Sequence, residues 1–342
     1  MEIRTLRRQE REALLALLDG WDVGDGWRGR DFFRRYMERD PTYADENVWV
    51  AAEGGHLLGC VQIFPRRLRL GAAAVPTGGI GSVFTDPEQR RRGIGAALLD
   101  RAARAMAERG MELSLLFTAR VPWYTGLGWH AWRYRRRLLE RGSSRPEETP
   151  GLEVAGFEPA RDLAAVQALH ERFDADRDGA VLRDAALWRG SLEVAGNPGE
   201  EFSLARRDGA LVAYLRAVVL YGILTLTEYA CEPGAEPELA ELIVRALARR
   251  DSDPMAGAAR VEGDARLRAL AGPAVRDAAL WASLGERGVV AHEFEDGASM
   301  LRCLDAPALA RRLGEPGDAP SEDLLARWLP PERFAFWPAD RF

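Results

Sequence analysis

Residues 90–96, Arg-Arg-Arg-Gly-Ile-Gly-Ala, have the residue types and the spacing of an anion-binding loop. They stand between a predicted strand and a predicted amphipathic helix, and the first amides of a helix have no partner within the helix. Because the helix dipole is positive at this end and glycine lets a ligand approach the backbone, such a start can bind a pyrophosphate. The arginines add charge for further phosphates. The alternative is an ordinary helix start without a ligand.

The elements that position this loop follow from periodicity and turn signals. Strands are predicted over 2–6, 47–53, 56–64, 75–85 and 111–118, and helices over 9–18, over 31–39 and from the glycine loop to Arg109. The loop thus follows the fourth strand. A Rossmann site requires its glycines after the first strand and an acidic residue about 20 residues further on, so that pattern does not apply.

The second half of the chain repeats this order weakly. After a polar linker at 141–151, strands are predicted near 152–157 and over 223–230, helices over 162–173 and 237–249, and a hairpin that turns at Asp208-Gly209. The segment 231–237 is acidic and has no arginine and glycine loop. We interpret this half as a degenerate copy of the first. A third piece from about residue 289 contains a strand near 299–304, a helix over 306–313 and an aromatic end that is expected to dock on the protein.

Composition excludes several classes of function. The 342 residues include no lysine, so all 47 basic residues are arginine, which excludes P-loop, Schiff-base and pyridoxal-phosphate lysines. Cys60, Cys231 and Cys303 lie far apart, which excludes a disulfide framework and a zinc ribbon. No pair of the four histidines has metal-ligand spacing, so no metal is expected. The net charge of −6 argues against a general nucleic-acid binder.

Hydropathy indicates where the protein works. No apolar run approaches the roughly 20 residues of a membrane span, and the first twelve residues are charged, unlike a signal peptide. We therefore expect a cytoplasmic protein without membrane or nucleic-acid partners.

Two motifs in order carry a family resemblance. Residues 83–99, VFTDPEQRRRGIGAALL, and residues 123–129, WYTGLGW, resemble the pyrophosphate loop and the tyrosine element of the GNAT superfamily of acyl-CoA-dependent N-acyltransferases. The resemblance covers about residues 1–140 and implies acetyl-CoA as co-substrate. It implies backbone contacts to the pantetheine arm at Val83, Phe84 and Thr85. It also implies phosphate contacts at Arg90, Arg91, Arg92, Gly93, Ile94, Gly95 and Ala96.

A narrower resemblance is to the Eis-like branch of that superfamily. Residues 83–93, the segment SMLRCLDAPALA (299–310) and an aromatic end in phenylalanine carry it. It implies an α/β (α+β) fold of two tandem GNAT-like mixed sheets flanked by helices, plus a small C-terminal α/β segment. The implied domains are a catalytic unit over 1–142, a degenerate unit over 151–288 and a shortened sterol-carrier-like segment over 289–342. Homo-oligomers occur in this branch, and the subunit count stays open.

The family's reaction needs a base for the amine and an acid for the departing thiolate. The resemblance implies that Tyr124 is the acid; the alternative is a core tyrosine with a satisfied hydroxyl. Residues 78–85 contain no carboxylate and no histidine, so the base comes from elsewhere. In the Eis-like branch it is the C-terminal carboxylate, here that of Phe342. Such a group titrates at about 3.3–3.7, so burial would have to raise its pKa. The alternative is a tail that only covers apolar surface.

We expect residues 20–31 to line the acceptor site. They join the two early helices, where GNAT proteins commonly line this site. Trp21, Asp22, Asp25 and Trp27 suit a cationic amine through charge and cation–π attraction, unless the segment is a solvated loop. We expect an acetyl-CoA-dependent N-acetyltransferase that acts on a primary amine of a small cationic molecule in a ternary complex. The alternatives are a non-catalytic acyl-CoA-binding or scaffold protein and a ligase-like acyltransferase with tandem GNAT domains.

Overall fold

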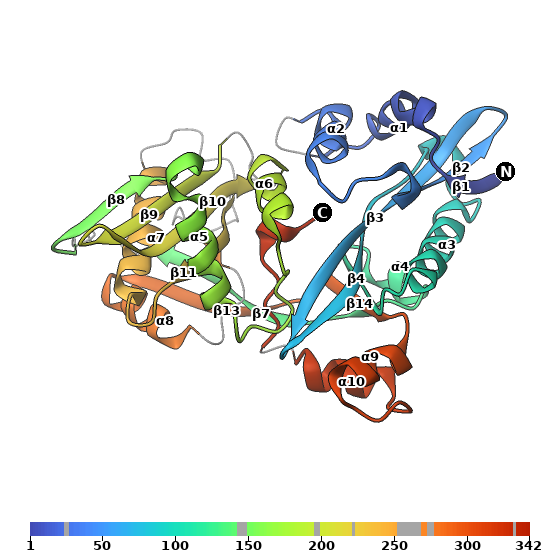
Figure 1. Cartoon of the computed structure of the whole chain (residues 1–342). Helices are drawn as coiled ribbons and strands as arrows, with labels where there is room; N and C mark the ends of the chain where they lie inside the picture. The colour runs from blue at the N-terminus through green and yellow to red at the C-terminus, as the bar shows by residue number, and fades with distance from the viewer. Residues whose placement is uncertain are drawn as a thin grey trace.

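The computed structural model describes residues 1–23, 27–141, 149–194, 199–220, 223–251, 268–271, 277–330 and 333–342. In this part of the chain the strands form two seven-stranded mixed sheets flanked by helices, and the two sheets lie side by side (Figure 1). The predicted α/β fold with two tandem mixed sheets is therefore confirmed. Most of the expected linker, residues 142–148, lies outside the described residues.

The first sheet contains most of the N-terminal strands. Its spatial order is β1 (Glu2–Thr5), β2 (Val48–Glu53), β3 (His56–Leu70), β4 (Ala73–Thr85), β5 (Leu113–Phe117), β14 (Ser299–Cys303) and β6 (His130–Ala131). Only β4 and β5 pair in parallel among these neighbours.

Helices cover both faces of the first sheet. Their bounds are α1 (Arg11–Leu18), α2 (Gly29–Arg39), α3 (Ile94–Glu108), α4 (Val121–Thr125), α9 (Ala306–Leu313) and α10 (Ser321–Trp328). Helix α3 packs against one face, where Leu98 meets Val61 and Leu116 in a common core. Helices α9 and α10 cover the other face, which includes Leu115 and Leu301. The alternation of side chains along each strand sends neighbouring residues to the two cores.

The second sheet repeats the order of the first with later strands. The order is β8 (Leu152–Gly156), β9 (Glu201–Arg207), β10 (Ala210–Leu220), β11 (Ile223–Cys231), β12 (Arg268–Ala271), β7 (Tyr134–Arg141) and β13 (Val289–Asp296). The pairing directions match those of the first sheet position by position, with the parallel pair at β11 and β12. Its helices are α5 (Pro159–Phe173), α6 (Ala185–Val194), α7 (Glu236–Asp251) and α8 (Ala278–Glu286).

Two strands are exchanged between the sheets. Strand β7 follows β6 in the chain but pairs with β12, whereas β14 follows β13 but pairs with β5. The divisions expected at residues 142 and 289 therefore do not separate the two sheets. Backbone pairing does not depend on which part of the chain supplies a strand, so chain position does not assign β7 or β14 to a sheet.

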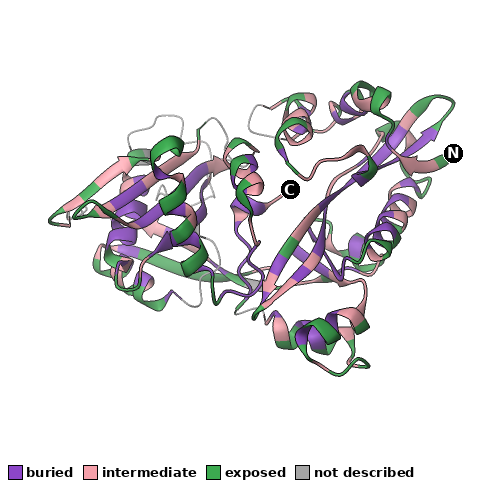
Figure 2. Ribbon diagram, viewed as in Figure 1, coloured by how far each residue is buried: buried purple, intermediate pink, exposed green. Residues whose placement is uncertain are grey.

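The C-terminal residues, which the sequence suggests form a small α/β segment, contribute strands to both sheets. Strand β13 extends the second sheet, β14 extends the first, and residues 333–342 return between the sheets to end near α2 and β3 (Figure 1). Burial continues along this tail, which includes the buried Phe334, Phe336 and Trp337 (Figure 2). None of the described helices has the length and apolar character needed to cross a membrane.

Candidate active site

Strand β4 bends near its end. Cys60 of β3 pairs with Phe84, and Gln62 pairs with Gly81, so Ser82 and Val83 stand together opposite a single residue of β3. Ser82 has a positive φ of 50° at this position. This arrangement is a β-bulge, which bends a strand and increases its twist.

The parallel pairing of β4 with β5 ends before the bulge. It runs from Thr77 to Ile80, whereas β4 continues to Thr85. Within the described residues, no strand pairs beyond Ile80 with the edge of β4 that faces β5. The positions expected to bind the pantetheine arm, Val83, Phe84 and Thr85, lie in this stretch. Their backbone groups on the β5 side are therefore available to an extended ligand.

The glycine loop opens helix α3 as predicted. Gly93 precedes the helix in the left-handed conformation, with a φ of 75°, and Ile94 is the first helical residue. The amide of Ala97 donates to the carbonyl oxygen of Gly93 at 3.0 Å, so the amides of Ile94, Gly95 and Ala96 precede the first helical bond. A left-handed residue followed by helical ones forms a concave nest of N–H groups that accepts an anion.

The three arginines of the loop have different surroundings. The side chain of Arg92 is held by an ion pair with Glu53 at 3.0 Å. Arg90 and Arg91 are exposed, and in the described part of the chain neither makes an ion pair. Two guanidinium groups are thus available for phosphates beside the helix start.

Trp123 is a neighbour of this loop that sequence reasoning did not single out. A Cβ atom added at Gly95 would lie 3.3 Å from its indole, and 42% of Trp123 is exposed. In the sequence, only its position directly before Tyr124 in the motif could have marked Trp123 as a site residue. An exposed tryptophan does not belong to a periodic pattern of apolar residues that would single it out.

Tyr124 lies on the short helix α4, directly after β5. Its ring packs edge to face against Trp123, at 4.7 Å between centroids, and against Trp129 at 6.4 Å. The indole N–H of Trp129 donates to the hydroxyl of Ser114 on β5 at 3.1 Å, which fixes this turn to the strand. Burial raises the pKa of Tyr124 to about 12, against the lowering effect of Arg120. The hydroxyl therefore keeps its proton at neutral pH.

Phe342 lies on β4 beside the bulge. Its ring stacks on Phe64 of β3, with 5.2 Å between centroids and an angle of 19°, and contacts Phe117 of β5 at 5.7 Å. A Cβ atom added at Gly79 would be 2.3 Å from this ring. One added at Gly81 would be 3.2 Å from both the main-chain carbon and the oxygen of Phe342. The main-chain end of Phe342 thus lies where β4 leaves β5.

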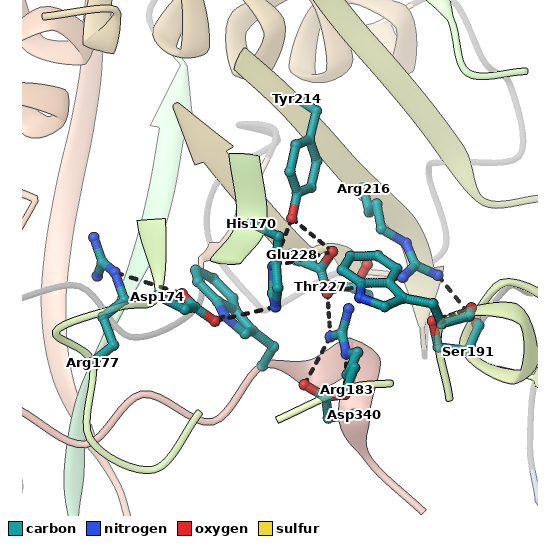
Figure 3. A network of polar contacts seen from close by, with 12 residues as sticks. His170, Asp174, Arg177, Arg183, Ser191, Tyr214, Arg216, Thr227, Glu228 and Asp340 are labelled. Carbon is teal, nitrogen blue, oxygen red and sulfur yellow. Dashed lines mark hydrogen bonds and ion pairs between the residues drawn. The ribbon is translucent and has the colours of Figure 1, made fainter. Parts of the chain in front are cut away.

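A buried polar network of the second unit holds the tail (Figure 3). Asp340 forms an ion pair with Arg183, which in turn pairs with Glu228 of β11. Burial alone would raise the pKa of Glu228, but Arg183, and after it His170 and Arg216, outweigh it and lower the pKa to about 2. Glu228 therefore serves this network as a permanent anion, and the described contacts keep it fully buried. Arg183 and Asp340 carry no sequence signal because they are far apart in the chain.

The expected acceptor residues are only partly brought together. Trp21 stacks on Phe84 of β4, with 5.7 Å between centroids, so it lies beside the bulge. The guanidinium of Arg35 instead lies over the ring of Trp27, 4.7 Å from its centroid. Asp22 is exposed, and Asp25 lies outside the described residues.

A small cleft of about 30 Å³ lies beside the tail, between the two units. It is lined by residues of α2 and the turn after it, β3, α6 and the segment before it, and the tail. These are Tyr36, Asp40, Pro41, Arg66, Arg183, Leu187, Gly190, Ser191, Val194, Ala339, Asp340 and Arg341. Its charges are largely paired, since Arg66 binds Asp40 at 2.6 Å and Arg183 binds Asp340 at 2.6 Å. No cluster of histidine, cysteine and acidic side chains among the described residues has the arrangement of a metal site.

Comparisons with known proteins find relatives for the N-terminal part of the chain. Residues 2–132 match the family model of the acetyltransferase (GNAT) domain. The N-acetyltransferase Eis of Mycobacterium tuberculosis is 27% identical over 171 residues, which cover 46% of this chain and 42% of that protein. The matched part is thus less than half of the relative's length.

Solved structures share the fold over most of the chain. A GCN5-related N-acetyltransferase from Anabaena variabilis is 16% identical with a TM-score of 0.65, and the match covers 90% of this chain and 74% of that one. Eis1 from Mycobacterium abscessus is 17% identical with a TM-score of 0.58, over 90% of this chain and 75% of that one. Residues 2–132 therefore match the acetyltransferase (GNAT) domain family, within a chain that is similar to Eis N-acetyltransferases.

Proposed function

We propose that this protein is an acetyl-CoA-dependent N-acetyltransferase that acts on a primary amine of a small cationic molecule by direct attack in a ternary complex. The observation that carries the proposal is the gap between β4 and β5. It opens after Ile80, and the nest at the start of α3 follows β4 in the chain, while Tyr124 on α4 follows β5. An extended cofactor with a pyrophosphate and a reactive thioester could use both groups.

The cofactor would be held mainly by backbone groups. The amides of Ile94, Gly95 and Ala96 would bind the pyrophosphate, and Arg90 and Arg91 further phosphate oxygens. The pantetheine arm would pair with β4 at residues 83–85, as an added strand pairs with a free edge. Arg92 would act less directly, because Glu53 already binds it.

The reaction then requires two proton transfers. The amine nitrogen attacks the thioester carbonyl carbon, an N–C bond forms and the C–S bond breaks. The carboxylate of Phe342 would take the proton that the nitrogen loses, and the hydroxyl of Tyr124 would give its proton to the CoA sulfur. The support for Phe342 is its position against Gly81, beside the bulge. The support for Tyr124 is its raised pKa, which keeps it protonated until the thiolate forms.

The acceptor is assigned from the charges that remain beside this site. Asp40 and Asp340 are already bound to arginines, so the carboxylate of Phe342 is the anion that we propose for the amine. Trp21, stacked on Phe84, adds an aromatic face on the side of the acceptor loop.

The test measures CoA release from acetyl-CoA with a panel of small amines. Four chains are compared: the chain ending at Phe342, one lacking Phe342, one extended by a single glycine, and Phe342→Leu. We expect deletion and extension to lower kcat by about 10²-fold or more, because the base is removed or displaced, and Phe342→Leu to keep most of it.

Two results would contradict the proposal in different ways. Equal rates with and without Phe342 would remove the carboxylate from the mechanism. A chain that acetyl-CoA stabilises thermally, but that acetylates no amine of the panel, would be a binding protein instead of a transferase.

A further inference from the structure

The turn that precedes Phe342 is clamped by one arginine of the second unit. The Nε of Arg183 donates to Oδ1 of Asp340 at 2.6 Å, and its Nη2 donates to Oδ2 at 2.8 Å (Figure 3). Only 1% of the Arg183 side chain and 5% of the Asp340 side chain are exposed. Two parallel bonds between planar groups fix orientation as well as distance.

Arg183 is itself held from three sides. Its Nη2 also binds the carboxylate of Glu228 on β11, and Glu228 accepts a hydrogen bond from the Tyr214 hydroxyl at 2.9 Å. Its guanidinium lies over the ring of Trp188, at 4.6 Å from the centroid. The segment before it pairs with β3, where the amide of Leu182 donates to the carbonyl of Arg67 at 2.8 Å. Arg183 is thus a rigid point between the two sheets.

The tail has a second anchor just before the clamp. Trp337 is fully buried in the core of the second unit, and its indole N–H donates to Asp174 at 2.8 Å. Phe342 follows Asp340 by two residues, which span at most about 7 Å. The clamp at Asp340 therefore limits where Phe342 can reach on β4.

Stability alone is a weak reason for this clamp. Moving two charges out of water costs several kcal/mol, and a buried ion pair is often no better than an apolar pair of the same volume. An apolar residue at position 340 would bury the tail but would not fix its direction. What the ion pair adds is orientation of the last two residues.

We propose that Arg183 and Asp340 are positioning residues, through which the degenerate second unit sets where Phe342 lies on β4 in the first unit. This inference rests on the proposed function, because it assigns Phe342 its role in the reaction. Neither side chain touches the reacting atoms. Their effect passes through the placement of the Phe342 carboxylate.

The experiment compares Asp340→Asn and Arg183→Lys with the control Arg333→Gln. Arg333 also binds the tail to the second unit, through Asp178 at 2.5 Å, but it lies before Trp337 and is 46% exposed. We expect both clamp variants to lower kcat by about 10²-fold, because a misplacement of about 1 Å can cost that much. The KM for acetyl-CoA stays within about twofold, since the cofactor site is untouched. Arg333→Gln keeps the original kcat.

Deletion of Phe342 separates positioning from general stability. In the chain that lacks Phe342, Asp340→Asn has nothing left to position and lowers kcat no further. An equal fold-loss with and without Phe342 would overturn the inference, and so would a loss of kcat in Arg333→Gln that matches the loss in Asp340→Asn.

A further variant guards against a failure to fold. Asp340→Glu keeps the charge but lengthens the side chain, so we expect a folded protein with reduced kcat. If Asp340→Glu keeps the kcat of the unaltered chain while deletion of Phe342 lowers kcat, the positioning role is excluded and the proposed function stands. A fully active Phe342 deletion would instead remove the role of the carboxylate, and positioning with it.

Discussion

The ring of Phe342 occupies the space that a side chain at Gly79 would take. A Cβ atom there would lie within 2.3 to 2.6 Å of three atoms of the ring. Glycine at this position of β4 therefore lets the end of the tail lie flat against the strand. A substitution of Gly79 can thus test the placement of Phe342.

Gly79→Ala tests that placement from the side of the first unit. The added methyl group displaces the ring, so we expect kcat to fall by about tenfold or more while the KM for acetyl-CoA is retained. Gly156→Ala is the control, because a Cβ atom there meets nothing within 4 Å. Steady-state kinetics with both substrates varied separates the two parameters. Unchanged kcat in Gly79→Ala would mean that the position of Phe342 is irrelevant to the reaction.

Tyr124→Phe removes the proposed acid. We expect kcat to fall by about 10²-fold, and the affinity for acetyl-CoA to stay, because the ring packing is kept. Since burial raises the pKa of Tyr124 to about 12, the hydroxyl stays protonated well above neutrality, and kcat of the unaltered chain does not fall between about pH 8 and about pH 10 through this group. A pH–rate profile checks this. Tyr43→Phe, another tyrosine of the first unit, is the control. A basic limb below about pH 10 that Tyr124→Phe abolishes would contradict the assignment.

Gly93→Ala and Gly110→Ala form a matched pair at the two ends of α3. Both glycines have a φ of 75°, and a Cβ atom at either meets nothing within 4 Å. Each substitution places alanine in the left-handed region and should cost about 1 kcal/mol of stability. Only Gly93→Ala is expected to weaken CoA binding, by about tenfold, because it distorts the nest. Calorimetric titration with CoA measures this, and equal affinities in both variants would exclude the loop as the phosphate site.

Glu228→Gln tests the charge of the buried network. Because the pKa of Glu228 is lowered to about 2, its carboxylate stabilises the fold above the unfolded value of about 4.3, and this contribution is lost as the pH falls toward 2. We expect the variant to be less stable by about 3 kcal/mol at neutral pH, and the difference to shrink between about pH 4 and about pH 2. Urea unfolding at several pH values measures it. Glu108→Gln, at the solvent-exposed ion pair with Arg101, is the control with little effect. A difference that does not change with pH would show that charge is not the cause.

Local signals in the sequence predicted many elements well. The helix expected over 306–313 has those bounds as α9. The hairpin expected at Asp208-Gly209 joins β9 and β10, and both residues have positive φ, at 50° and 78°, as a tight hairpin turn requires. The glycine loop opens α3 as predicted, because a helix start is determined by a few adjacent residues.

The end of β3 shows where local reasoning stops. Pro65 marks a strand end in the sequence, yet β3 continues to Leu70. The last residue of β3 that pairs with β2 is Gln62, so Pro65 lies where that edge of the strand is open and its missing N–H costs no ladder bond. Which edges are open depends on the whole sheet.

The contacts that the second unit makes with the tail could not be predicted from the sequence either. Arg183 and Asp340 meet only because the tail returns between the sheets, and neither has a local pattern. The exchange of β7 and β14 is invisible for the same reason, since either strand fits either open edge by hydrogen bonding alone. Tyr124 and the glycine loop could be selected as candidates because each lies in a short contiguous motif.

The strand exchange also sets an order in time. On the ribosome, residues 1–132 emerge first, and β5 can pair with β4 early, but β5 gains its second neighbour only when β14 has been synthesised. The contact of Glu112 with Arg312, 200 residues later in the chain, forms later still. Until then one edge of β5 is unpaired and invites association with other chains. We therefore expect the first sheet to be completed late although most of its strands are made first, and growing chains to depend on protection through most of their synthesis.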